Sequence, residues 1–243
     1  MTTQAIEDGL TSEDEQVRIE NSLRTDFTPT LKQIKRGLSD ESAAVRWAWA
    51  KRTDFTPTPE QIEIGLTDTN ITVQKFWINK TCYTPTPAQI ERGLTDDEPS
   101  IRIAWVQRMG WTPTPEQIER GLTDNESSVK RAWLKRTDYT LTPEQIERAL
   151  NDLDWGVRLA MVQRTDFTPT PEQASKGLLD NDIDVYMLWL QRWDVEWNET
   201  QIREGLQSDN GAIRAAWEQI LLIRNEKLTD TLETSASHTM PSL

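Results

Sequence analysis

The chain has very few residues of the kinds that build reactive or metal-binding centres. Its 243 residues include one cysteine, Cys82, and one histidine, His238. A single cysteine excludes an intramolecular disulfide and a cysteine-rich zinc site, and a single histidine leaves little for histidine-based catalysis. Cys82 is expected to be a half-buried thiol without a catalytic role, because no histidine in the repeated part of the sequence could activate it. We therefore expect a protein that is not an enzyme, with no cofactor and no metal.

Basic residues and long apolar runs are also scarce. The chain has 27 Lys and Arg against 40 Asp and Glu, a net charge of −13. Duplex nucleic acid and anionic membranes attract cationic surfaces, so neither is an expected direct partner. No apolar run reaches the roughly 20 residues of a membrane-spanning helix, and the first residues lack a signal-peptide pattern. A cytoplasmic location is the default expectation.

A period of 28 residues runs through the sequence. Eight units follow one another without insertion, and Ala149-Leu150 stands in register where the other units have Gly-Leu. The glycines of these dipeptides are Gly9, Gly37, Gly65, Gly93, Gly121, Gly177 and Gly205. The predicted units lie near residues 1–27, 28–55, 56–83, 84–111, 112–139, 140–167, 168–195 and 196–228.

Each unit carries a first helix signal. In the third unit Thr58 is a predicted N-cap, Pro59 the first helical residue and Gln61 the third, which is the pattern of a capping box. The predicted helix is short, with Ile62 and Leu66 on one face. Because glycine weakens a helix, the recurring glycine, here Gly65, indicates a close approach of the backbone to another group.

A second helix follows in each unit after an aspartate that we predict to be its N-cap. These aspartates are Asp40, Asp68, Asp96, Asp124, Asp152 and Asp180. The helix has an apolar stripe of Val or Ile, Ala and Trp with helical spacing. Its tryptophans are Trp49, Trp77, Trp105, Trp133, Trp189 and Trp217. Such rings could stack on nucleic-acid bases, but core packing between helices is the favoured interpretation.

A single pair of short helices cannot bury its own apolar stripe, so the units must stack. The predicted fold class is all-α: an α-solenoid, or superhelix, of eight two-helix repeats. We expect one repeat domain over residues 1–228. Residues 229–243 are rich in Ser and Thr and aperiodic, and are expected to form a disordered tail.

Two sequence patterns resemble known short α-solenoids. Asp-x-x-x-x-Val-Arg-x-Ala, found at Asp40–Ala48 and Asp152–Ala160, looks like the second-helix signature of HEAT-like repeats. Thr-Pro-x-x-Gln-Ile followed by Gly-Leu-x-Asp is similar to the leucine-rich-repeat variant family. The resemblance covers about residues 1–223. It implies a protein-binding scaffold. One branch of HEAT-like proteins has a basic concave face, binds DNA and excises bases. A base-excision enzyme is therefore a third alternative, which the net charge of −13 disfavours.

Aromatic and apolar residues late in the chain depart from the repeat. The stripe does not require them, and such residues are frequent anchors at protein interfaces. Repacking near the end of the stack is an equally weighted interpretation. The candidate partner-binding residues are Trp155, Ile183, Tyr186, Trp193 and Trp197.

Glutamates in the first helices also recur with the period and predict an acidic surface column. They are Glu60, Glu63, Glu91, Glu116, Glu119, Glu144 and Glu147. A row of carboxylates could imitate a nucleic-acid backbone, although a solvated face that keeps the chain soluble is the favoured interpretation. Arg92, Arg120 and Arg148 interrupt the row.

The main hypothesis is a non-enzymatic scaffold or adaptor that recognises another protein through the solenoid surface. The alternative is an acidic DNA-mimicking inhibitor that blocks a nucleic-acid-binding protein with a basic groove, such as a nuclease or repressor.

Overall fold

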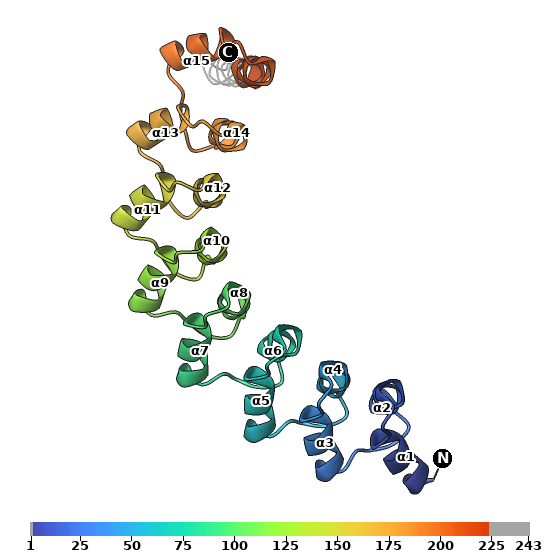
Figure 1. Cartoon of the computed structure of the whole chain (residues 1–243). Coiled ribbons are helices and arrows are strands. Elements are labelled where there is room, and N and C mark those ends of the chain that lie inside the picture. The colour runs from blue at the N-terminus through green and yellow to red at the C-terminus, as the bar shows by residue number, and fades with distance from the viewer. Residues whose placement is uncertain (1, 224–243) are drawn as a thin grey trace, which may run out of the picture. The chain divides into compact units, whose positions relative to one another are not determined.

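The computed structural model describes residues 2–223, in which every regular element is a helix. The helices come in consecutive pairs, one pair to each 28-residue unit (Figure 1). They are α1 (Thr3–Leu10), α2 (Glu15–Ser22), α3 (Leu31–Leu38), α4 (Ala43–Lys51), α5 (Pro59–Leu66), α6 (Ile71–Ile78), α7 (Pro87–Leu94), α8 (Pro99–Gln107), α9 (Pro115–Leu122), α10 (Ser127–Leu134), α11 (Pro143–Leu150), α12 (Trp155–Val162), α13 (Pro171–Gly177), α14 (Ile183–Gln191) and α15 (Glu199–Leu206). A last helical segment, 211–223, pairs with α15. The predicted fold class, an α-solenoid of two-helix repeats, is confirmed.

The chain divides into two compact units, Met1–Arg136 and Thr137–Leu243. In the first unit, the second helices α2, α4, α6, α8 and α10 pack on one another in sequence, and each also packs on the first helix of its own repeat. In the second unit α12 packs on α14 in the same manner. The extent of the predicted domain, 1–228, stays a prediction, and the predicted tail lies outside the described residues.

The first helices begin as the sequence predicts. Thr58 caps α5, and the Gln61 side chain accepts a hydrogen bond from the Thr58 backbone N–H, which completes a capping box. Six other first helices begin with the same box, and four of those, α7, α9, α11 and α13, start with proline as α5 does. The side-chain oxygen of the N-cap threonine or asparagine thereby accepts a hydrogen bond from a backbone N–H in the first turn, which has no partner within the helix.

The second helices begin two residues later than predicted. Asp40 is not the cap: its carboxylate accepts the N–H of Ser42 at 2.9 Å, and Ser42 caps α4. The register aspartates of the next five repeats do the same for Asn70, Glu98, Glu126, Asp154 and Asp182. The predicted caps Asp40, Asp68, Asp96, Asp124, Asp152 and Asp180 therefore form the turn before each helix. The error arises because an aspartate can accept a backbone N–H either at the cap or in a preceding turn.

The glycine and the tryptophan of each repeat form a contact pair. A Cβ added to Gly93 would lie 2.0 Å from Trp105, and the same clash occurs in five other repeats. All six register tryptophans are at most 2% exposed, which confirms that they belong to the core. In the sixth repeat both partners change together: Ala149 replaces the glycine and Met161 replaces the tryptophan, and both are buried.

In four repeats an arginine of the second helix contacts an aspartate of the next repeat. Arg46 reaches forward to the Asp68 carboxylate with two hydrogen bonds of 2.7 Å, and its other nitrogen donates to carbonyls of its own repeat. Arg18, Arg102 and Arg158 do the same with Asp40, Asp124 and Asp180. The planar guanidinium suits such a two-pronged contact.

A second arginine reaches backward, and we call this contact the arginine joint. Arg192 donates to the carbonyls of Val162 and Phe167 in the preceding repeat and lies over the Phe167 ring. The joint recurs at Arg52, Arg108, Arg136 and Arg164, each over the aromatic residue at the same register. The guanidinium donates to backbone carbonyls at and just after a helix C-terminus, where a cation is favourable, and the ring adds a cation–π contact.

Candidate functional site

Two of the candidate partner-binding residues lie close together on the surface of the second unit. Trp155 is the first residue of α12 and Ile183 the first residue of α14, and these two helices pack side by side. The Trp155 side chain is 47% exposed and the Ile183 side chain 41% exposed. At the same position other repeats place residues such as Ala43, Pro99 and Ser127.

Two leucines that the sequence analysis did not select extend this surface. Leu153 precedes α12 and is fully exposed, and Leu179 follows α13 and is 82% exposed. Both line one shallow pocket of about 570 Å³. We name the set Leu153, Trp155, Leu179 and Ile183 the apolar edge.

A sequence signal for these leucines does exist. The residues at the register of Leu153 are polar in the other repeats: Glu13, Glu41, Thr69, Asp97, Asn125, Asn181 and Asp209. Those at the register of Leu179 are Thr11, Ser39, Thr67, Thr95, Thr123, Asn151 and Gln207. Several of these side chains donate to the preceding helix, as Thr67 does to the Glu63 carbonyl at 2.8 Å. Leucine cannot make that bond, and here it gains no burial in exchange.

Two other candidates pack against the hydrophobic core, as the repacking interpretation expects. Trp197 is 8% exposed and packs edge-to-face on Trp217 with ring centroids 5.7 Å apart. Tyr186 is half-buried, and its hydroxyl accepts a hydrogen bond of 2.9 Å from the Trp217 indole N–H. Tyr186 stands where other repeats have the forward-reaching arginine, and Ser208 stands where its aspartate would be. The pair has changed together, as repacking requires.

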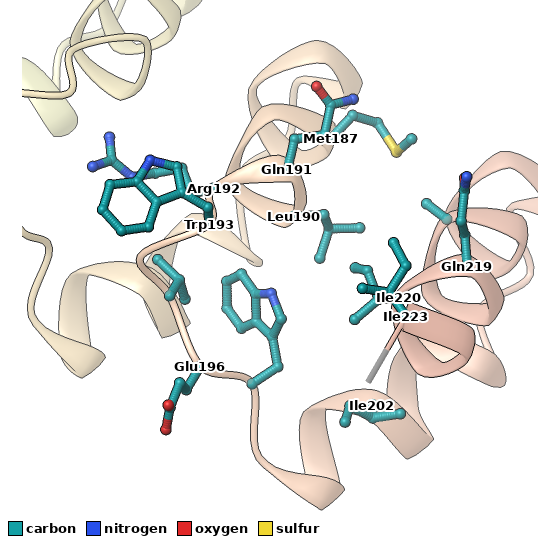
Figure 2. A pocket seen from close by; sticks show the side chains of 13 residues that line it. Met187, Leu190, Gln191, Arg192, Trp193, Glu196, Ile202, Gln219, Ile220 and Ile223 are labelled. Atoms are coloured by element: carbon teal, nitrogen blue, oxygen red, sulfur yellow. The ribbon is translucent and has the colours of Figure 1, made fainter. Parts of the chain in front are cut away.

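Trp193, the last candidate, is the most exposed tryptophan of the described chain at 86%. It follows α14 and lines a second pocket, of about 890 Å³, between α14 and the helical segment 211–223 (Figure 2). None of the apolar-edge residues lines this pocket.

The acidic column is partly neutralised by the repeat that follows each glutamate. Glu63 pairs with Arg92, and Glu91 lies 2.7 Å from Arg120. Hydrogen bonds from Arg92 and Gln89 hold the pKa of Glu63 below its ordinary value, and hydrogen bonds from Arg120 and Gln117 do so for Glu91. Glu147 receives a hydrogen bond from Gln173 and lies 3.5 Å from Lys176, and its pKa is lowered as well. These side chains alternate with cations rather than forming a continuous negative row.

The remaining glutamates of the column divide into two groups. Glu60, Glu116 and Glu144 are fully exposed in the first turn of α5, α9 and α11, where their own backbone N–H and the capping threonine lower their pKa. Glu119 lies on α9 at the register of Glu63 and Glu91. A carboxylate at a helix N-terminus is explained by capping and the helix dipole.

The other reactive residue types offer no assembled site. Cys82 is exposed in a turn rather than half-buried, and His238 lies outside the described residues. Within residues 2–223 no group of His, Cys, Asp and Glu side chains is arranged to hold a metal ion. No helix in the same range is long and apolar enough to cross a membrane.

Comparisons with known proteins support the fold. Residues 116–135, which run from the first turn of α9 to the residue after α10, match a family model described as a HEAT repeat associated with sister chromatid cohesion. Among solved structures, the chain is similar to a leucine-rich repeat variant with a novel repetitive protein structural motif. The two share 22% identity with a TM-score of 0.58 over 79% of this chain and 71% of the other. A search of curated proteins finds no significant match. At this identity the likeness concerns the fold alone, and it agrees with the resemblance expected from the sequence.

Proposed function

Since the chain is an α-solenoid of HEAT-like repeats, we propose that it is a non-enzymatic scaffold that binds a partner protein through the apolar edge of its second unit. One observation carries the proposal: four apolar side chains are exposed on adjacent repeats at positions where the rest of the chain has mostly polar or small residues. Exposed apolar surface of this kind is typical of protein interfaces. Trp155 would be the central anchor, because buried tryptophans contribute strongly to binding.

The local energetics favour this interpretation over a structural one. Leu179 stands where other repeats have a polar residue such as Thr67, whose side chain donates a hydrogen bond to the preceding helix. A hydrogen bond of this kind contributes about 1 kcal/mol of stability, which leucine does not provide. Leu153 and Leu179 bury little surface in the free chain. Neither substitution stabilises the isolated protein, so its benefit lies in a contact with another molecule.

The alternative of an acidic DNA mimic has less support. Three of the seven column glutamates are matched with Arg92, Arg120 or Lys176 of the next repeat. A nucleic-acid backbone has no such alternation of charge. A base-excising enzyme would need a basic groove, and the chain as a whole carries a net charge of −13.

The proposal is tested by restoring the repeat pattern at the edge. In the triple variant Leu153→Asn, Trp155→Ser and Leu179→Thr, each residue becomes one that another repeat already has at that register. Affinity capture from native extract, treated with nuclease, should recover a partner with the original chain and lose it at least tenfold with the variant. A tenfold loss corresponds to about 1.4 kcal/mol of binding free energy, which the removal of one interface anchor can account for.

A matched control lies in the first unit. Ile71 occupies the register of Trp155 and Ile183 and is 42% exposed, and Ile71→Ser should leave capture unchanged. Capture should also persist as salt is raised to 0.5 M, since apolar contacts are weakly screened. Capture that survives the triple variant, or that disappears with salt and is competed by DNA, would overturn the proposal in favour of the acidic surface.

A further inference from the structure

The joint between the last two repeats lacks its arginine. At the register of Arg52, Arg108, Arg136, Arg164 and Arg192, the eighth repeat has Ile220. The aromatic residue over which that arginine would lie is replaced by Val195. Leu222 stands where other repeats have the aspartate that pairs with the arginine, such as Asp194 beside Arg192.

The pocket of about 890 Å³ lies at this position. In the preceding joint, the Arg192 guanidinium donates to the carbonyls of Val162, Arg164 and Phe167. One repeat later, the same register positions are Leu190, Arg192 and Val195, and all three line the pocket. Among residues 2–223, none donates a hydrogen bond to the carbonyl oxygens of Leu190 and Val195. The acceptors of an arginine joint are therefore present, and residues 2–223 supply no donor for them.

The last helix explains why no side chain of the described part fills the pocket. Helix α14 ends at Gln191, so that Arg192 leaves the helix with extended backbone and reaches back to the preceding repeat. In the eighth repeat the helix instead continues through position 220 to at least 223. Figure 2 shows Leu190 on one side of the pocket, Ile220 and Ile223 on the other, and Ile202 below them.

We propose that this pocket receives an arginine side chain from a partner polypeptide, which completes in trans the joint that the chain makes five times within itself. A guanidinium carries donors in a fixed fork that can serve two carbonyls at once. The apolar walls suit the arginine stem, and the exposed Trp193 ring offers a cation–π contact in place of the missing aromatic residue. The net charge of −13 favours a cationic ligand. The inference does not depend on the apolar edge, because the two sites share no residue.

The test uses the full chain and the peptide acetyl-Gly-Arg-Gly-amide, with citrulline in place of arginine as an uncharged isostere. Binding is followed by NMR chemical shifts of the tryptophan indole groups. The arginine peptide should bind saturably and at least tenfold more tightly than the citrulline peptide. Ile220→Arg, which places a guanidinium in the pocket from within, should weaken peptide binding at least tenfold and raise the melting temperature.

Control variants keep the outcome decisive. Ala215→Arg adds the same charge at an exposed position of the same helix that does not line the pocket, and it should bind the peptide as the original chain does. Should Ile220→Arg fail to fold, Gln219→Arg provides a second way to occlude the pocket. Equal affinity for both peptides, or undiminished binding to the folded occluded variant, would overturn the proposal.

Two other occupants would also contradict it. Concentration-dependent dimers that Ile220→Arg abolishes would assign the pocket to a second copy of the chain. A tenfold gain in peptide affinity on Arg224→Gln would assign it to the chain's own arginine. Since neither readout involves the apolar edge, failure here leaves the proposed scaffold function standing, and loss of the edge function leaves this pocket unaffected.

Discussion

The contact between glycine and tryptophan is the residue-scale feature on which each repeat depends. Replacing Gly93 by Ala would place a methyl group 2.0 Å from the Trp105 ring. Because the ring is fully buried, it can move only by displacing its neighbours. We expect Gly93→Ala to lower the free energy of unfolding by about 1–3 kcal/mol, the usual cost of overpacking a core, as measured by urea unfolding.

The sixth repeat supplies the rescue for this variant. Ala149 and Met161 show that the smaller, flexible side chain accommodates the extra methyl group. Gly93→Ala combined with Trp105→Met should therefore be more stable than the sum of the two single changes predicts. As a control, Gly211→Ala meets only the end of the Arg214 side chain at 3.7 Å and should not destabilise the chain. Strict additivity of the pair would show that the two positions are not coupled.

One arginine joint carries a defect that arises from a single turn. The buried Arg108 Nε has no hydrogen-bond partner, because Gly110 occupies the register of Asp54 and Asp166, whose carboxylates accept the corresponding Nε. Gly110 has a φ of 93°, which an aspartate would adopt only with strain. The whole turn must therefore be restored, by Met109→Thr with Gly110→Asp.

We expect this double substitution to stabilise the chain by about 1 kcal/mol, since a buried donor gains an acceptor. The reverse change, Asp166→Gly, should destabilise it by about 1–3 kcal/mol, because the buried Arg164 Nε loses the carboxylate that accepts its hydrogen bond. Thermal unfolding monitored by circular dichroism measures both. Opposite signs support the assignment, and two changes of the same sign would refute it.

At the scale of elements, ion pairs between the second helix of one repeat and the turn before the second helix of the next repeat tie the repeats together. Arg158 holds Asp180 with two bonds of 2.7 Å, and both side chains are nearly buried. Burial raises the pKa of Asp180, but hydrogen bonds from Arg158 and from the Asp182 amide outweigh it, so that the pKa lies below the ordinary 3.8. A carboxylate with a lowered pKa stabilises the folded state above the unfolded pKa, and that contribution is lost as the pH falls through the lowered value.

Asp180→Asn should therefore lower the free energy of unfolding at pH 7 by about 2–3 kcal/mol, somewhat less than a fully buried pair would lose. The variant should also lose less stability than the original chain between pH 4 and pH 2. Asp96→Asn is the matched control, because the preceding repeat has Gln74, bonded to the Leu66 carbonyl, at the position of the arginine. Equal losses in the two variants would show that the arginine is not responsible.

At the scale of the whole molecule, the period determines most of what can be predicted. The helix pairs, the capping boxes and the buried tryptophans all follow from patterns that recur every 28 residues, so each repeat confirms the others. The sequence predicts the caps of the second helices two residues too early, because the turn aspartate and the cap have the same chemistry. Trp197 and Tyr186 could not be assigned from the sequence, since a departure from the period can serve repacking as well as recognition.

The same reasoning explains what the sequence does not reveal about the candidate sites. Leu153 and Leu179 are ordinary residues whose exposure depends on three-dimensional position. The pocket beside Ile220 exists only because the last helix continues past the register at which α14 ends. Residues that keep the period stabilise the repeats, and those that depart from it at the surface are the ones that we propose to bind other molecules.

This division is tested most directly by making one substitution at two registers of the same unit. Trp189 keeps the period and is 2% exposed, whereas Trp155 departs from it and is 47% exposed. Measured by urea unfolding of the full chain, Trp189→Ala should cost about 3–5 kcal/mol, as for a large core ring, and Trp155→Ala less than about 1 kcal/mol. Equal losses of stability in the two variants would contradict the account.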